Sequence, residues 1–224
     1  MFPLLVTERP PRRTTRIAWG VAALVAAAGC GAGRGTAPPG ETPAADGSAP
    51  AVEAAARADS VRQSYTDADV AFMTDMIHHH AQALVMAGMA PTHGASGPLQ
   101  ILSERIIVGQ NDEIALMQRW LRDRGKPVPD PAAPAHGGHA MHMPGMLTEA
   151  ELAELDAARG AEWDRLFLTY MIRHHQGALT MVEELFASYG AAQGDDMFRI
   201  ASGIAADQTA EIDRMRSMLR EIVF

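Results

Sequence analysis

Apolar side chains recur at intervals of three and four residues along four stretches of the chain, which is the spacing of one buried face of an α-helix. The clearest row consists of Phe72, Met76, His79, Ala83 and Met86. The pattern predicts helices over about 66–90, 98–124, 148–188 and 195–222. We therefore expect an all-α protein.

The pattern occurs twice, and this internal repeat predicts how the helices pair. The motif Met-Ile-x-His-His ends at His80 and again at His175, and the row Gln-x-x-Glu-Ile begins at Gln110 and again at Gln208. Each copy is a helix hairpin with one uncovered apolar face. Two hairpins related by a pseudo-twofold axis cover each other, so we expect a four-helix bundle built from two duplicated hairpins.

The N-terminal region has the pattern of an export signal. Arginines precede a short apolar run over 17–28, which is too short to span a bilayer, and the run leads into Cys30, the single cysteine. This order resembles a bacterial lipobox, in which Cys30 becomes the lipidated first residue; the alternative is a plain secretory signal with a spare cysteine. We expect a lipoprotein-type signal peptide over 1–29 and a periplasmic or cell-surface location, with the lipid anchor as the contact to the membrane.

The rest of the chain divides into a tether and a duplicated bundle. Gly, Pro and Ala dominate 30–53, which predicts a flexible tether, and the bundle is expected over 54–224. Capping boxes at Thr66 and Thr148 mark two helix starts, and Gly160 is a point at which the third helix could break. The expected parts are a first hairpin over 66–125, a His/Met-rich linker over 126–147 and a second hairpin over 148–224.

Composition narrows the classes of partner. Apolar residues make up 47% of the 224 residues, which is enough for a core. The formal net charge of −8 argues against nucleic acid or an anionic membrane surface as a partner. Because one cysteine cannot form an intrachain disulfide, the fold must depend on its core or on a metal.

The repeated histidines carry the candidate chemistry. Buried imidazoles are unfavourable unless their ring nitrogens are satisfied. The polar positions expected near the symmetry axis are His79, His80, His174, His175, Glu113 and Glu211, with Met76 and Met171 one turn from the histidines. One interpretation is a polar layer in which each histidine donates to a glutamate across the bundle. The duplication favours the other interpretation, a metal site, with His79 and His174 facing the interior.

Ligand softness favours copper, either Cu(I) or Cu(II), as the metal. Thioethers with imidazoles suit copper, whereas di-iron bundles use a Glu-x-x-His motif that these histidines lack. The linker adds a second group of soft ligands, which are His136, His139, Met141, His142, Met143 and Met146. Such a tract could capture a copper ion and pass it on; the alternative is an expendable linker whose histidines are incidental.

Both copies of Phe-x-x-x-Met-Ile-x-His-His, at 72–80 and 167–175, and both Gln-x-x-Glu-Ile-x-x-Met rows resemble the bacterial "domain of unknown function 305" family. The resemblance covers roughly residue 66 to the C-terminus and implies a ferritin-like four-helix bundle. Some family members are associated with copper binding and copper tolerance in the periplasm. By position, it implies as ligand candidates His79, His80, His174 and His175, with Met76 and Met171 as neighbours.

The sequence thus predicts an exported, lipid-anchored protein whose partner is a metal ion and which sequesters or transfers copper. The first alternative is a ferritin-like oxidase acting on Fe(II) or Cu(I). The second is a structural or partner-binding bundle without metal. The sequence contains no nucleophile motif, P-loop or dinucleotide-binding turn.

Overall fold

The computed structural model describes residues 65–132 and 143–223, and every regular element in these two ranges is a helix. The helices are α2 (Asp67–Gly88), α3 (Gly97–Asp123), α4 (Glu149–Ala157), α5 (Ala161–Ala187) and α6 (Asp195–Val223). The all-α prediction is confirmed. Outside the described ranges lie the predicted signal peptide, the tether, and the candidate residues Cys30, His136, His139, Met141 and His142.

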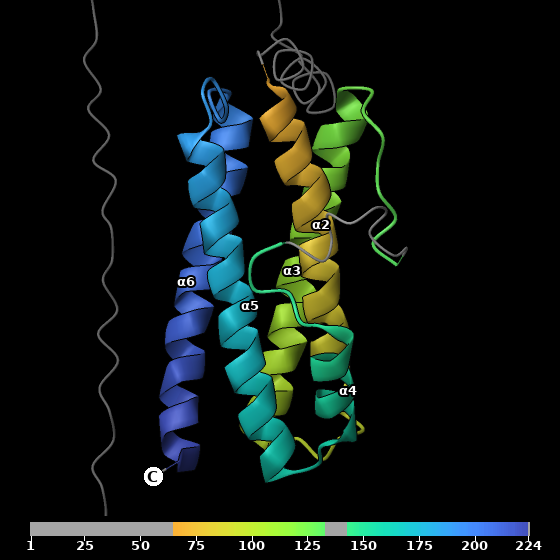
Figure 1. Ribbon diagram of the computed structural model, residues 1–224, viewed down its shortest axis with the longest axis vertical. Coiled ribbons are helices and arrows are strands. Elements are labelled where there is room, and N and C mark those ends of the chain that lie inside the picture. Colours follow the sequence, from red (N-terminus) through yellow and green to blue (C-terminus); the bar gives the residue numbers. More distant parts are fainter. Residues whose placement is uncertain (1–64, 133–142, 224) are drawn as a thin grey trace, which may run out of the picture. The chain divides into compact units, whose positions relative to one another are not determined.

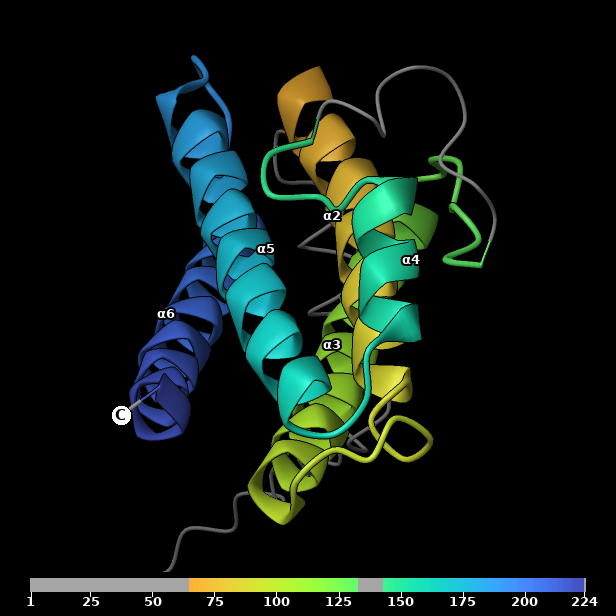
Figure 2. The same cartoon turned by 60° about the horizontal axis from the view of Figure 1, so that its bottom comes forward.

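Four long helices form the bundle as two antiparallel hairpins (Figure 1). Helix α2 packs along α3, α5 packs along α6, and the hairpins meet through α2 and α5. Helices α3 and α6 run in opposite directions and approach each other at few places. The short helix α4 precedes α5 and packs against it (Figure 2). None of the helices in the described ranges is apolar over a length that would cross a membrane.

The helix boundaries follow from local chemistry. Both predicted capping boxes are present, since the Asp69 carboxylate accepts from the Thr66 backbone N–H at 2.7 Å and the Glu151 carboxylate accepts from that of Thr148 at 2.8 Å. The third predicted helix is divided into α4 and α5. The break falls at Gly160, whose φ of 59° lies in the left-handed region that favours glycine.

Two apolar clusters fill the bundle on either side of the repeated histidines. The first includes Phe72 and Trp120, and the second includes the stacked rings of Trp163 and Phe167, whose centroids are 4.7 Å apart. Along α2, Met76 and Ile77 belong to the first cluster and Ala83 to the second. The histidines of α2 therefore lie between two apolar clusters, where an unsatisfied polar atom is costly.

Candidate metal centre

Four histidines form one buried layer where α2 and α5 cross. His79, His80, His174 and His175 each expose 0% of their surface. The rings of His79 and His174 face each other with centroids 3.9 Å apart, as expected for the two interior positions. Because adjacent helical residues point about 100° apart, the other two histidines are directed to the flanks. We call these four side chains the histidine layer.

The outer histidines are each held by a glutamate of the neighbouring helix. His80 Nε2 donates to Glu113 on α3 at 2.7 Å, and His175 Nε2 donates to Glu211 on α6 at the same distance. The two glutamate side chains are 17% and 25% exposed, so they connect the buried rings to the surface. This part of the site matches the predicted polar layer.

The inner histidines have different partners from the outer ones. His79 Nε2 donates to the backbone carbonyl of Pro144 at 3.0 Å. His174 has no partner on either ring nitrogen, and Nδ1 lacks a partner in all four rings. Since carboxylate and carbonyl oxygens only accept, Nε2 carries a proton in these three rings. A histidine that binds a metal ion has this tautomer, with its second nitrogen donating to a carboxylate or carbonyl.

Burial keeps the inner rings uncharged. Desolvation, and then the charge of His80, lower the pKa of His79 to about 3, against the opposing effect of the Pro144 hydrogen bond. Desolvation and the neighbouring charge of His79 lower the pKa of His174 well below its ordinary value. Both imidazoles are therefore neutral near pH 7, which is the form that binds metal ions.

Thioethers lie one helical turn from the inner histidines. Met76 and Met171 are both fully buried and precede His79 and His174 by three residues, which places each pair on one helix face. Within the described ranges, no three His, Cys, Asp or Glu side chains are already grouped to hold an ion. A metal ion in this layer would therefore be bound by fewer than three imidazoles, with thioethers completing its coordination. Binding by more imidazoles would require the histidine side chains to rotate.

The last residues of the linker lie directly against the histidine layer. We call residues 143–147 the linker end; within it, Met143 and Met146 are partly buried. The Gln82 side chain fixes Leu147 through hydrogen bonds of 2.7 and 3.0 Å to its N–H and carbonyl. A Cβ on Gly177 would lie 1.9 Å from the Pro144 oxygen, so this glycine permits the linker end to cross α5.

Sequence reasoning missed Pro144 and Gln82, because their roles depend on the path of the linker. The only signal was Gly177, a glycine in mid-helix that suggests a close backbone approach. Met143 joins the first apolar cluster rather than the histidine layer. The structure therefore brings together the eight predicted bundle residues, but it describes only the two methionines of the linker end.

Taken together, the duplicated hairpins and the histidine layer define an all-helical bundle with a symmetric buried His/Glu centre. The chain belongs to the family described as Domain of unknown function (DUF305), whose profile matches residues 69–219. The family resemblance seen in the sequence is thus confirmed. A comparison with curated proteins finds no match.

Solved structures of this family have the same fold. A DUF305 fragment from Deinococcus radiodurans is 31% identical over 71% of this chain and 99% of its own, with a TM-score of 0.61. A DUF305 protein from Streptomyces coelicolor, described as a candidate secreted protein, is 27% identical over 69% of this chain and 92% of its own, with a TM-score of 0.60. CopM in its Cu(II)-bound form is 30% identical over 68% of this chain and 96% of its own, with a TM-score of 0.56.

Proposed function

We propose that this protein is an exported copper-binding protein that sequesters or transfers the ion in the cell envelope. The observation that carries the proposal is that each histidine of the histidine layer keeps an unpartnered ring nitrogen. Leaving a buried nitrogen unpaired costs about 1–3 kcal/mol. Four such nitrogens in one layer are unfavourable unless a ligand satisfies them.

The chemistry of the donors favours copper over other metals. Imidazoles with nearby thioethers form a soft set that suits Cu(I), and imidazoles alone also bind Cu(II). CopM, which shares the fold, has been solved in Cu(I)-, Cu(II)- and Ag-bound forms. Copper is the cargo in this proposal, and the metal ligands are His79, His80, His174, His175, Met76 and Met171, with Glu113 and Glu211 orienting the outer rings.

The linker is proposed as the capture device for copper. The ligands would be His136, His139, Met141, His142, Met143 and Met146. The linker end contacts the bundle through the hydrogen bond from His79 to Pro144, so captured copper would have a short path to the inner histidines. Displacing the Pro144 carbonyl would also free His79 Nε2.

Export through the predicted signal over 1–29 and lipidation at Cys30 complete the proposal. The description of the Streptomyces coelicolor relative supports export. The intact mass of the mature protein tests it: lipidation at Cys30 predicts a chain that starts at this residue with added acyl mass. A mature chain that starts elsewhere or carries no lipid contradicts the anchor.

Metal content after desalting tests the function. The full chain is incubated separately with Cu(I), Cu(II), Zn²⁺ and Fe²⁺, and bound metal is measured by mass spectrometry. We expect copper to be retained in preference to zinc and iron. Deletion of 136–142, which keeps the linker end, should leave the copper that is bound by the bundle. A protein that retains no copper contradicts the function, and complete loss on deletion alone would make the histidine layer structural.

A further inference from the structure

A second polar site lies on the other side of the glutamates, in a cleft between α3 and α6. The cleft has a volume of about 280 Å³ and is lined by Glu113, Glu211 and Asp207, with Gln110 and Gln208 at its floor. It exists because α3 and α6 approach each other at few places. We propose that this cleft binds a hydrated divalent cation of the magnesium class, and this proposal does not depend on copper binding.

Buried amides point to a ligand in the cleft. Gln110 is 2% exposed, and neither its amide oxygen nor its amide nitrogen has a partner. Gln208 is 1% exposed, and its amide oxygen also lacks a partner. A buried unsatisfied amide costs about 1–3 kcal/mol. An ion that carries its own water supplies both kinds of partner, because metal-bound water donates to oxygens and accepts from N–H groups.

The charges gather at one end of the cleft. Arg105 precedes Glu113 on α3, and Asp207 precedes Arg214 on α6. Because α3 and α6 run antiparallel, these orders place the two arginines toward one end of the cleft and Asp207 with Glu113 toward the other. The pKa of Asp207 is raised by burial and then by the charges of Glu113 and Glu211, so these three carboxylates act on one another. A cation among them relieves this repulsion.

The repeat shows that the third carboxylate is present in the second hairpin alone. Gln110 and Glu113 correspond to Gln208 and Glu211, but Asp207 corresponds to Gly109. A Cβ on Gly109 would meet nothing within 4 Å, so a side chain would fit at that position. Asp207 on α6 therefore faces a position on α3 that has no side chain. This arrangement leaves room for an ion between the two helices.

The kind of donors indicates the class of ion, and the cleft has room for that ion with its water. Carboxylate and amide oxygens suit hard cations such as Mg²⁺, Mn²⁺ and Ca²⁺. No three carboxylates or histidines in the described ranges converge on a bare ion. Mg²⁺ keeps several of its waters, and six waters at roughly 30 Å³ each fit within the volume of the cleft. The oxygens would then hold the ion through its water shell.

Mn²⁺ is a suitable probe because the free ion gives a strong electron paramagnetic resonance signal. The full chain is titrated with Mn²⁺, and the fall in free signal gives the dissociation constant; excess Mg²⁺ should restore the signal. We expect Asp207→Asn to weaken Mn²⁺ binding at least tenfold. The matched control Asp213→Asn, which removes an exposed acid on the same helix, should change it less than twofold.

A second variant keeps the test decisive if Asp207→Asn is unstable. Gln110→Leu removes the unpartnered amide at nearly constant volume, so it should weaken Mn²⁺ binding while the thermal midpoint stays the same or rises. Copper retention should be unchanged in both variants. Wild-type protein that leaves the free Mn²⁺ signal unaltered overturns the proposal, as does equal weakening by Asp207→Asn and Asp213→Asn.

Discussion

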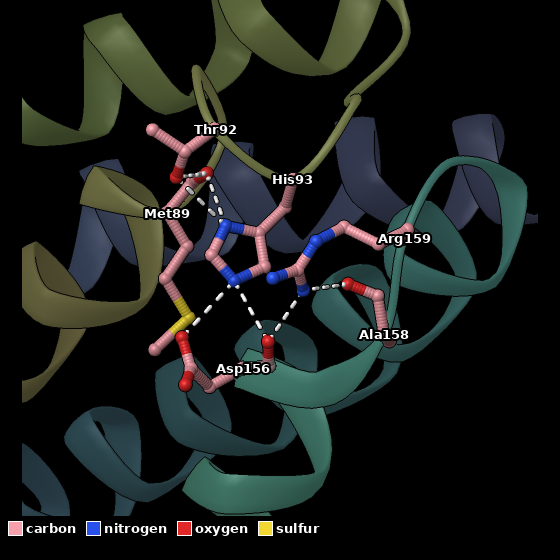
Figure 3. Close-up of polar contacts among 6 residues, drawn as sticks. All are labelled: Met89, Thr92, His93, Asp156, Ala158 and Arg159. Carbon is pink, nitrogen blue, oxygen red and sulfur yellow. Dashed lines mark hydrogen bonds and ion pairs between the residues drawn. The ribbon is translucent and has the colours of Figure 1, made fainter.

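Within residues 65–132 and 143–223, histidines are buried at two places, and their surroundings differ. His93, in the α2–α3 connection, is 5% exposed and has both ring nitrogens within hydrogen-bond distance of backbone carbonyls, Nδ1 of Met89 at 2.8 Å and Nε2 of Asp156 at 2.9 Å (Figure 3). In the histidine layer, by contrast, every ring keeps at least one nitrogen without a partner. The first arrangement joins segments of chain, whereas the second leaves donor atoms available.

Burial alone does not distinguish a structural histidine from a candidate metal ligand. His93 connects the α2–α3 loop to the end of α4, where Arg159 also donates to the Asp156 carbonyl (Figure 3). Its polar atoms are fully used by the fold. The histidine layer is deeper, yet its hydrogen bonds to Glu113, Glu211 and Pro144 use only Nε2. Partners therefore distinguish a structural histidine from a candidate ligand better than exposure does.

The largest expected effect is on acid stability. The pKa values of His79 and His174 are lowered in the folded protein, whereas an unfolded histidine has a pKa of about 6.5. Between pH 6.5 and about 3 the unfolded chain therefore binds more protons, and the free energy of unfolding falls as pH decreases. Each ring contributes about 1.4 kcal/mol per pH unit, roughly 2.7 kcal/mol for both.

Urea unfolding between pH 7 and pH 4 measures this slope in the wild type and in His79→Leu/His174→Leu. The double variant should lose less stability with each pH unit, because its inner positions cannot bind protons. Equal slopes in the two proteins would show that the inner rings are not desolvated.

Next in size is the close contact of the linker end. In Gly177→Ala the new Cβ would collide with the Pro144 carbonyl, so the linker end must move and release His79 Nε2. We expect a loss of about 3 kcal/mol in the free energy of unfolding. Gly203→Ala is the matched control, since its Cβ would meet nothing within 4 Å, and it should stabilise α6 by up to about 1 kcal/mol. Equal effects of the two substitutions would contradict the packing of the linker end.

A smaller loss is expected at the structural histidine. His93→Leu removes the hydrogen bond that Nε2 donates to the Asp156 carbonyl and the one that Nδ1 accepts from the Thr92 hydroxyl, at about 1 kcal/mol each. Thermal or urea unfolding should show a decrease of about 2 kcal/mol, and copper retention should stay at the wild-type level. Loss of copper in this variant would remove the distinction between the two kinds of histidine.

The smallest effect is expected at His174, whose ring makes no side-chain hydrogen bond and has only the backbone of His79 acting on it. His174→Leu replaces an unpartnered buried ring by an apolar side chain, so the free energy of unfolding at pH 7 should change by less than about 1 kcal/mol. Urea unfolding at pH 7 checks this. A loss of several kcal/mol would reveal an interaction that satisfies this ring in the folded protein.

The sequence predicted those features that depend on local spacing. The repeat anticipated both hairpins, the capping boxes at Thr66 and Thr148 marked helix starts, and the paired glutamates lay opposite histidines as expected. The hydrogen bonds from His79 to Pro144 and from His93 to Asp156 could not be predicted. Each joins residues more than sixty positions apart in the sequence, and each involves a residue in a connection between helices. A periodic pattern specifies faces of helices, but it does not specify the path of a connection.

Copper binding by the inner histidines is the central claim, and a comparison of two variants tests it most directly. In a chain lacking 136–142, which keeps the linker end, copper affinity is measured by competition with a chelator for His79→Leu/His174→Leu and for His93→Leu. We expect the double variant to bind copper at least tenfold more weakly than its parent, whereas His93→Leu should bind copper with the affinity of its parent. Equal affinities in the two variants would contradict this claim.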